Sequence, residues 1–398
     1  MIKKIIYCIF ISCWAYTNEL ITNVKINGNT KTKDYIILQE IKHPTGITFN
    51  SLIAKADQER IYSLDIFNFV QIGYIDSTYH ILVQEKQNYS ISPKIKKNNT
   101  LDKGFGLKIK FHNINGNNNQ IESAVTFGKI KYFFTQYTNS LINQKNHFFS
   151  VLSEIEKHDN LIDNYSKIYS NVTLSYNFKN KKRMMSIFLN GQKNKLKYLV
   201  GESESYSFIN TGINFIANKN NINKKNNINL ILNQYFSLNK ADNYSKILFK
   251  HQYIKKIKDN SSYLLINSQI QLISNNFSPI YEISYLGGDD LVRSYETNPE
   301  LNHTEVQNKL KFKNSIFNSI QFEIPIFNSK KTQTNLFFFI DQAVGSNKNN
   351  NFNFSNKIKG YGFGYSIFTK KEMKFDLSIG LNQYGQRLFH FNVVSNPY

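Results

Sequence analysis

The sequence contains very little cysteine, proline and arginine. Its 398 residues include two cysteines, six prolines and only four arginines, although Lys+Arg together number 49. Both cysteines, Cys8 and Cys13, lie within the first twenty residues. If this segment is cleaved on export, the mature chain has no thiol, which excludes a disulfide scaffold and cysteine chemistry.

A long hydrophobic run is also missing. The apolar stretch at residues 5–15 is too short for an ordinary transmembrane helix, and beyond residue 20 no run approaches the ~18 residues that such a helix needs. Lys3 and Lys4 precede the stretch and a polar turn follows it, which predicts a signal peptide over residues 1–19. An N-terminal membrane anchor and a lipid attached at Cys13 are the alternatives. If the chain enters a membrane, we expect it to do so as strands.

Acidic residues are few. The chain has 28 Asp+Glu and a formal net charge of +21, which in a concentrated patch would favour nucleic acid or an anionic membrane surface as partner. The lysines are instead dispersed in asparagine-rich runs such as residues 218–227, a bias typical of AT-rich genomes. They do not gather with aromatic residues on one element, so we predict no nucleic-acid partner.

Catalytic motifs are absent as well. The eight histidines are scattered, and neither a His-Glu-x-x-His motif, a nucleophile elbow nor a metal-ligand spacing occurs. We therefore predict that the protein is not an enzyme and uses no cofactor or metal. The alternative is a membrane-barrel enzyme with an acid–histidine dyad, for which Asp289 or Asp290 beside His303 are the candidates.

Residues 21–85 have a mixed pattern. Alternation predicts a strand at 21–27, and apolar residues at helical spacing predict helices at 32–41 and 49–64. Two further strands are expected at 69–76 and 80–84. A β-α-α-β-β module of about 65 residues follows, small but able to fold alone.

This module resembles a polypeptide-transport-associated (POTRA) domain. The residues that carry the resemblance are Gly28 and Asn29 in the first turn, Asp57 in the second helix, and Phe67 at the corner between helix and strand. The resemblance implies a periplasmic domain at residues 20–86 whose exposed sheet edge accepts an extended client strand through main-chain hydrogen bonds. An unrelated α+β domain is the alternative.

From about residue 100 to the end, the pattern has a period of two. At 168–178, for example, Val172, Leu174 and Tyr176 share one face, and at 316–326 Ile320 and Phe322 face away from the polar residues. About fifteen or sixteen such segments follow one another. Segments of about ten residues with one apolar and one polar face are typical of transmembrane barrels, whose closure removes the strand edges. A soluble all-β domain is the alternative.

Residues 286–295 form a distinctive run in a long connection. They contain Gly287, Gly288, Val292, Arg293, Ser294 and Tyr295. An arginine kept where lysine is the default indicates a need for the planar guanidinium. The run resembles the sixth-loop motif of the BamA-like outer-membrane assembly family, in which a second glycine stands where this chain has Ser294.

Two acidic residues are the expected partners of this arginine. Residues 339–343 resemble the family's Phe-x-Asp-x-Gly strand, with Ala343 in place of the glycine. The resemblance implies that Asp341 meets Arg293 inside the barrel, and that Glu323 is a second acid on the same polar face. A bidentate pair would hold the loop in the lumen. Without the resemblance, both acids would be ordinary lumen carboxylates.

Three glycines alternate with aromatic residues in 360–365. At strand spacing, Gly360, Gly362 and Gly364 share one face, which lets another backbone approach closely. A phosphate-binding turn would need a following helix, and no helical pattern follows. The resemblance implies that the glycine face makes room for the loop while the aromatic residues face lipid.

Together these patterns predict a small α+β POTRA domain followed by an all-β transmembrane barrel of about 16 antiparallel strands. The predicted boundaries are 1–19 for the signal peptide, 20–86 for the POTRA domain, 87–103 for a linker and 104–398 for the barrel. A weak seam is expected between 104–111, where Gly104 and Gly106 lack side chains, and 386–394.

The resemblance also implies a function and a location. The chain would insert unfolded outer-membrane protein clients into the outer membrane of a bacterium, with the lipid bilayer and possible accessory assembly subunits as further partners. A two-partner polypeptide-secretion transporter and a passive outer-membrane channel are the alternatives.

Overall fold

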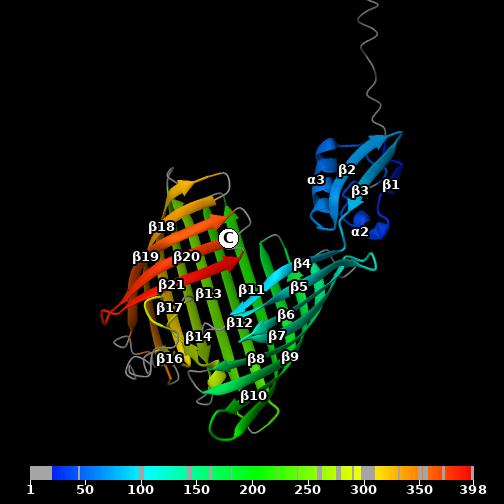
Figure 1. The fold of residues 1–398 in the computed structure, drawn as a ribbon. Coiled ribbons are helices and arrows are strands. Elements are labelled where there is room, and N and C mark those ends of the chain that lie inside the picture. Colours follow the sequence, from blue (N-terminus) through cyan, green and yellow to red (C-terminus); the bar gives the residue numbers. More distant parts are fainter. Residues whose placement is uncertain are drawn as a thin grey trace, which may run out of the picture. The chain divides into compact units, whose positions relative to one another are not determined.

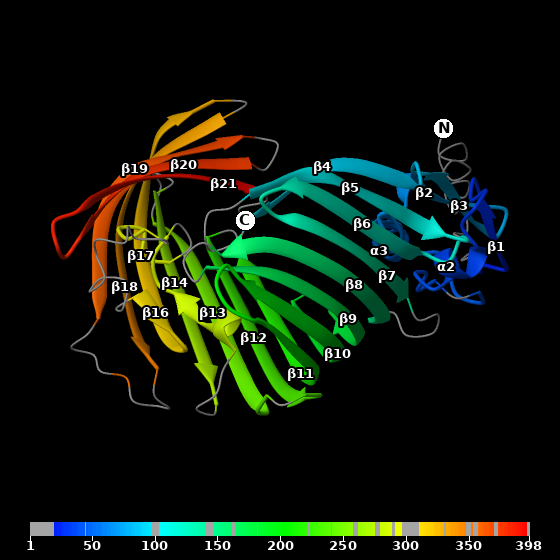
Figure 2. The same ribbon diagram turned by 60° about the horizontal axis from the view of Figure 1, so that its bottom comes forward.

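The computed structural model describes residues 20–43, 45–97, 103–140, 146–160, 164–180, 182–221, 223–239, 241–257, 262–274, 279–288, 291–296, 310–329, 332–347, 352, 357–369 and 373–395. The predicted signal peptide, with Cys8 and Cys13, lies outside these residues, as do Asp289, Asp290 and His303. The chain divides into two compact units (Figures 1 and 2). Of the described residues, the first unit holds 20–43, 45–91, 109–121, 139 and 140, and the second holds the others.

The N-terminal module has the predicted β-α-α-β-β order. Its elements are β1 (Asn23–Asn27), α2 (Asp34–Leu38), α3 (Ser51–Tyr62), β2 (Phe67–Ile75) and β3 (Thr78–Glu85). They form a three-stranded sheet of order β1-β3-β2, in which β1 runs parallel to β3 and β2 antiparallel to it. The first helix is shorter than predicted. The structure thus shows a small three-stranded sheet with two helices, and its identity as a POTRA domain stays a prediction.

Apolar side chains from every element of the module form its core. Ile37, Ile61, Phe67 and Ile81 are each fully buried. The second helix begins at Ser51 because the side chain of Asn50 accepts hydrogen bonds from the backbone N–H groups of Leu52 (2.9 Å) and Ile53 (3.2 Å).

The second part of the fold is a 16-stranded antiparallel sheet, of order β21-β20-β19-β18-β17-β14-β13-β12-β11-β10-β9-β8-β7-β6-β5-β4. Its strands are β4 (Tyr89–Lys97), β5 (Lys103–Ile114), β6 (Asn119–Gly128), β7 (Lys131–Ser140), β8 (His147–Asn160), β9 (Tyr165–Lys179), β10 (Arg183–Tyr198), β11 (Ser203–Asn221), β12 (Lys224–Ser237), β13 (Tyr244–Ile257), β14 (Ser262–Ile273), β17 (Asn314–Asn328), β18 (Thr332–Ser346), β19 (Ile358–Thr369), β20 (Met373–Asn382) and β21 (Arg387–Ser395). The predicted number of strands is therefore present.

The two faces of this sheet differ in chemistry. In one cross-strand row, Leu174, Leu189 and Thr211 are register partners, and both leucines are about half exposed. The neighbouring row of the opposite face contains buried Asn190 and Asn210. We call the face with the exposed apolar residues the outer face, and the face with buried polar residues the inner face. The alternation follows from the period of two in strands.

The linker predicted at 87–103 was wrong, because β4 occupies residues 89–97 of it and pairs with β5. The predicted seam was displaced for the same reason. The residues 104–111 belong to β5, which has neighbours on both sides, and the edge strands are β4 and β21. Gly104 and Gly106 instead let β5 approach β6 closely. A Cβ at Gly106 would lie 1.8 Å from the carbonyl oxygen of Val125.

The sheet order ends at β21 and β4, so the described strands have two edges and the closure expected of a barrel is not seen. Among the described residues, no helix combines the length and the hydropathy needed to cross a membrane.

Candidate functional site

The connection between β14 and β17 folds back on itself around the glycine pair. Beyond the short helix η1 (Ile280–Glu282), the strand β15 (Ser284–Tyr285) pairs with β16 (Lys311–Phe312). Val292 N–H donates to the carbonyl of Leu286 at 3.0 Å, and Gly288 N–H donates to the carbonyl of Tyr295 at 2.8 Å. Gly288 has a φ of 104°, a conformation that favours glycine. These bonds join residues 286–288 to residues 291–295, which together are called the tip.

Arg293 in this tip binds Asp341 on the inner face of β18. The Nε atom donates to Oδ2 at 2.9 Å and Nη2 donates to Oδ1 at 2.9 Å, which is a bidentate pair. The backbone N–H of Arg293 donates to the same Oδ2 at 3.0 Å. The Asp341 side chain is completely buried and that of Arg293 is 15% exposed. The contact between the rare arginine and Asp341 is therefore present.

Further groups fix the plane of the guanidinium. Its Nη1 donates to Gln321 Oε1 at 2.5 Å, and Nη2 donates to Ser319 Oγ at 3.2 Å. The Phe339 ring lies under it, with 3.7 Å between Cζ and the ring centroid. A lysine could satisfy neither the bidentate pair nor the stacking, which explains why arginine occupies this position.

Glu323 is not a direct partner of Arg293. Its Oε1 atom accepts a hydrogen bond from Gln321 (2.7 Å) and forms an ion pair with Lys374 Nζ (3.3 Å). Its Oε2 atom accepts a hydrogen bond from Asn335 (2.9 Å). The prediction that it pairs with the arginine was wrong, because Gln321 lies between them. Glu323 is completely buried and supports Gln321, which in turn holds the guanidinium.

The three glycines of β19 do not all contact the loop. Gly360 faces the loop, since a Cβ there would lie 1.5 Å from Ser294 Oγ. Gly362 and Gly364 instead let the backbone of β20 and two aromatic rings approach. Their Cβ atoms would lie 2.1 Å from the carbonyl oxygens of Ile379 and Leu377, 2.5 Å from Phe339 Cζ and 2.6 Å from Phe337 Cζ, respectively. The prediction that all three glycines accommodate the loop was therefore wrong for two of them. The intervening Tyr361, Phe363 and Tyr365 are exposed on the outer face.

Gly380 on β20 is a second contact of the tip that the sequence did not single out. A Cβ there would lie 2.8 Å from Ser294 Cα. Ser294 is fully buried between Gly360 and Gly380, so the serine at the position where the sequence resemblance has a glycine is accommodated by these two residues. Ala343 belongs to the buried cluster around the tip, with Leu286, Val292, Tyr295, Leu310, Phe317 and Ile358.

Gly360→Ala is expected to displace the tip and to destabilise its packing against β19 by about 1–3 kcal/mol, the usual cost of overpacking. The added methyl group meets Ser294, so Ser294→Gly in the same chain should restore the packing of the tip against β19. Protease sensitivity of the connection would measure both. Gly191→Ala is the matched control, since nothing lies within 4 Å of that Cβ. Equal sensitivity of the single and double variants would contradict the contact.

The base of the same connection is anchored at a second place. Glu282 of η1 pairs with Lys246 of β13 (Nζ–Oε2 2.5 Å) and accepts a hydrogen bond from Tyr244 OH (3.1 Å). Gln271 of β14 donates to the Glu282 carbonyl at 2.9 Å. The Tyr281 ring lies 4.5 Å below Lys167 Nζ of β9. No motif marks these residues in the sequence, and only the fold brings them together.

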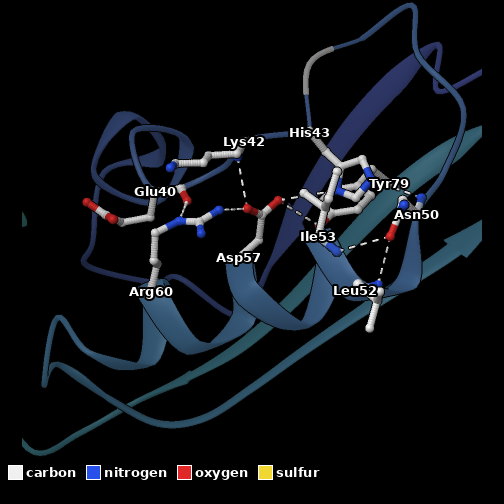
Figure 3. Close-up of polar contacts among 9 residues, drawn as sticks. All are labelled: Glu40, Lys42, His43, Asn50, Leu52, Ile53, Asp57, Arg60 and Tyr79. Carbon is white, nitrogen blue, oxygen red and sulfur yellow. Dashed lines mark hydrogen bonds and ion pairs between the residues drawn. The ribbon is translucent and has the colours of Figure 1, made fainter.

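A buried polar cluster joins the elements of the N-terminal module (Figure 3). Asp57 of α3 is fully buried and accepts hydrogen bonds from Lys42 N–H (2.9 Å), from Tyr79 OH (3.0 Å) and from the guanidinium of Arg60. His43 Nδ1 lies 3.4 Å from its second oxygen. The cluster ties α3 to β3 and to the α2–α3 connection, which gives Asp57 a structural role.

Burial determines the protonation of this cluster. It lowers the pKa of His43 from its usual 6.5, and the Arg60 charge lowers it further. Neutral His43 then accepts the Asn50 N–H at Nε2 (3.0 Å), which leaves the proton on Nδ1 facing Asp57. Burial also raises the pKa of Tyr79 to about 12, so that its hydroxyl stays a donor.

The other motif residues of the module shape its turns and core. Gly28 has a φ of 90°, and a Cβ there would lie 2.0 Å from the Val83 carbonyl oxygen. Asn29 donates to the carbonyl of Thr32 (2.9 Å) and to the carboxylate of Asp34 (2.6 Å). Phe67 is fully buried. Within the part of the chain that is described, no three His, Cys, Asp or Glu residues are grouped as metal ligands.

Comparison with known proteins identifies the fold. The chain is similar to the crystal structure of BamA from Haemophilus ducreyi lacking POTRA domains 1–3, with a TM-score of 0.73, 12% identity, and coverage of 94% of this chain and 83% of that one. CdiB from Escherichia coli is also similar, with a TM-score of 0.62, 11% identity, and coverage of 94% and 75%. For CdiB from Acinetobacter baumannii the TM-score is 0.60, at 11% identity and 94% and 73% coverage. Neither a protein-family model nor a curated protein matches the sequence. The fold expected from the sequence motifs is thus confirmed as that of BamA and CdiB.

Proposed function

We propose that this chain, which has the fold of BamA and CdiB, is an outer-membrane assembly factor that inserts unfolded β-barrel clients into the membrane. The outer face of the sheet, rich in exposed apolar residues, faces lipid, and the N-terminal module acts as a POTRA domain in the periplasm. The clients are unfolded outer-membrane proteins. Accessory assembly subunits are possible further partners.

The two edges of the 16-stranded sheet carry this proposal. Unpaired N–H and C=O groups of an edge strand form a template for another strand, and within hydrocarbon each unsatisfied group costs several kcal/mol. A client strand added to β4 or β21 satisfies these groups. The edges also expose large apolar side chains on alternate positions, among them Ile91 and Ile95 on β4 and Phe389 and Phe391 on β21.

The N-terminal module supplies a first binding place for the client. Its sheet order leaves β2 as an edge strand next to β3. An extended segment can bind along such an edge through main-chain hydrogen bonds, which make little demand on sequence. The Arg293 tip acts differently: it fixes the connection to β17–β20, next to the edge strand β21.

Export of a polypeptide through the lumen is the second candidate function, and the similarity to the two CdiB structures supports it. A passive channel needs neither the N-terminal module nor the Arg293 contact. Depletion of the protein distinguishes the three functions: loss of many folded barrels supports assembly, loss of one secreted protein supports export, and a change in solute permeability alone supports a channel.

A disulfide between the two edge strands is expected to reduce client insertion to background. Single cysteines at Ser90 or Ser92 of β4 are combined with cysteines at Leu388 or His390 of β21 in a chain without Cys8 and Cys13, and the pairs that oxidise are selected. Insertion of a client into liposomes is then measured before and after reduction. Reduction should restore it, because only access to the edges has changed.

The control is a cysteine pair between strands that are already neighbours, at the register partners Thr173 and Asn190. This disulfide should leave insertion unchanged. Wild-type insertion by a chain with oxidised edges would rule out edge addition.

A further inference from the structure

Three lysines follow one another on the outer face of β10. Lys193, Lys195 and Lys197 are exposed at alternate positions. The outward positions that precede them, Met185, Ile187 and Leu189, are apolar and 41–51% exposed. The outer face of this strand therefore changes from apolar to cationic within a few residues.

The outer face of the neighbouring strand β11 changes at the same level. Gly191 of β10 is the register partner of Val172 on β9 and Ile209 on β11. Beyond Ile209 the outward residues of β11 are all serines, whereas β9 keeps the exposed Ile168. Each later row places a lysine opposite a serine of β11, in the order Lys193–Ser207, Lys195–Ser205 and Lys197–Ser203. On the β9 side, the partners of the three lysines are Ser170, Ile168 and Ser166. Serine is too short to cover a lysine, and its hydroxyl can donate a hydrogen bond.

The position of this boundary matches the thickness of a membrane. A tilted strand crosses the hydrocarbon with about 9–11 residues, whereas β10 has 16 residues. Counted from Arg183, the first eleven residues end at Lys193. The lysines therefore lie at the level of the headgroups, at the end of the sheet where the connection to η1 leaves β14.

This part of the outer face, around the three lysines of β10, has an excess of positive charge. Lys157 of β8 is also exposed and, like Lys195, is a register partner of Ile168. Lysines two residues apart on a strand are about 7 Å apart, and those two strands apart about 10 Å. The nearby acids on the outer face or in the adjacent turn are Asp159 and Glu202. Among the described ion pairs, none involves the four lysines.

We propose that Lys157, Lys193, Lys195 and Lys197, with the flanking serines, bind the phosphate groups of lipid headgroups. This rests on the membrane placement in the proposed function. Phosphate attached to acyl chains fits both parts of the surface, because the ammonium groups bind the phosphate and the apolar rows below hold the chains. With the N-terminal module in the periplasm, the lipid belongs to the outer leaflet.

Binding of a fluorescent lipid A with two phosphates to the full chain in an uncharged detergent tests the proposal. The variant K193S/K195S/K197S should bind about 100-fold more weakly at low salt, since each lysine near an anionic surface contributes about fivefold. The matched control K219S/K224S/K255S removes three exposed lysines at the opposite ends of the strands and should bind as the wild type does. Dephosphorylated lipid A should bind weakly to every variant.

Equal affinity of the β10 variant and the wild type would overturn the proposal, as would an equal loss in the control variant. Full displacement by millimolar inorganic phosphate would also overturn it, because the ligand would then be free phosphate instead of a lipid. The assay contains no client. A chain that binds the lipid but inserts no client would therefore contradict the proposed function and leave the lipid site standing.

Discussion

Arg293→Glu is expected to release the tip of the β14–β17 connection and to reduce client insertion strongly. The substitution places a second carboxylate next to the fully buried Asp341 and removes the stacking on Phe339. Loss of one partner of a buried pair costs roughly 3–5 kcal/mol, and less where water enters. Proteolysis of the connection and the initial rate of client insertion into liposomes would measure the two effects.

The double variant Arg293→Glu/Asp341→Arg tests whether the pair acts directly. It restores opposite charges, although Gln321 and Phe339 remain placed for a guanidinium on the loop. We therefore expect partial recovery of both readouts. Arg183→Glu is the control, because this arginine is exposed on the outer face. If a folded Arg293→Glu chain inserted clients at the wild-type rate, the tip contact would have no part in the function.

Glu282→Gln is expected to release the base of the same connection. The change keeps the shape of the side chain but leaves Lys246 without its counter-charge in a site where the Glu282 side chain is only 10% exposed. An uncompensated charge of this kind costs roughly 3–5 kcal/mol when buried and less when wet. The expected result is faster cleavage near η1 by proteases.

Adding Lys246→Met to Glu282→Gln should reverse most of this loss. Replacement of both members of a buried pair by neutral groups is often nearly neutral for stability, whereas removal of one is not. Glu202→Gln, in an exposed turn, is the control. If the double variant were cleaved as readily as the single one, Glu282 would hold the connection by a means other than the pair.

The alternating pattern predicted the strands well, and the scarcity of arginine pointed to the Asp341 contact. Both are local features. A period of two indicates a half-buried strand, and an arginine among lysines indicates a partner that binds the planar guanidinium. The edge strand β4 was missed because Pro93 and a group of lysines interrupt its pattern. Proline is tolerated on an edge strand, so its presence there is consistent with the observed position of β4.

The remaining parts of the site depend on contacts between distant residues. The alternation placed Glu323 on the inner face, but it could not show that Gln321 lies between it and Arg293. The neighbours of Gly362 and Gly364 depend on where the Phe339 and Phe337 rings lie, which is a matter of packing. Glu282 has no local signal at all, since Lys246 and Tyr244 approach it only in the folded chain.

The two anchors of the connection have a mechanical consequence. The η1 end is held by side chains from β9, β13 and β14, and the tip is held by β17 and β18 and packs against β19 and β20. The described parts of the connection, residues 281–288 and 291–293, are therefore attached to the sheet in two places, one at β9, β13 and β14 and the other at β17–β20. Flattening of the curved sheet increases the distance between these two attachments. The force needed to part the edge strands is then shared with two ion pairs, at Lys246 of β13 and Asp341 of β18, neither of which lies on an edge strand.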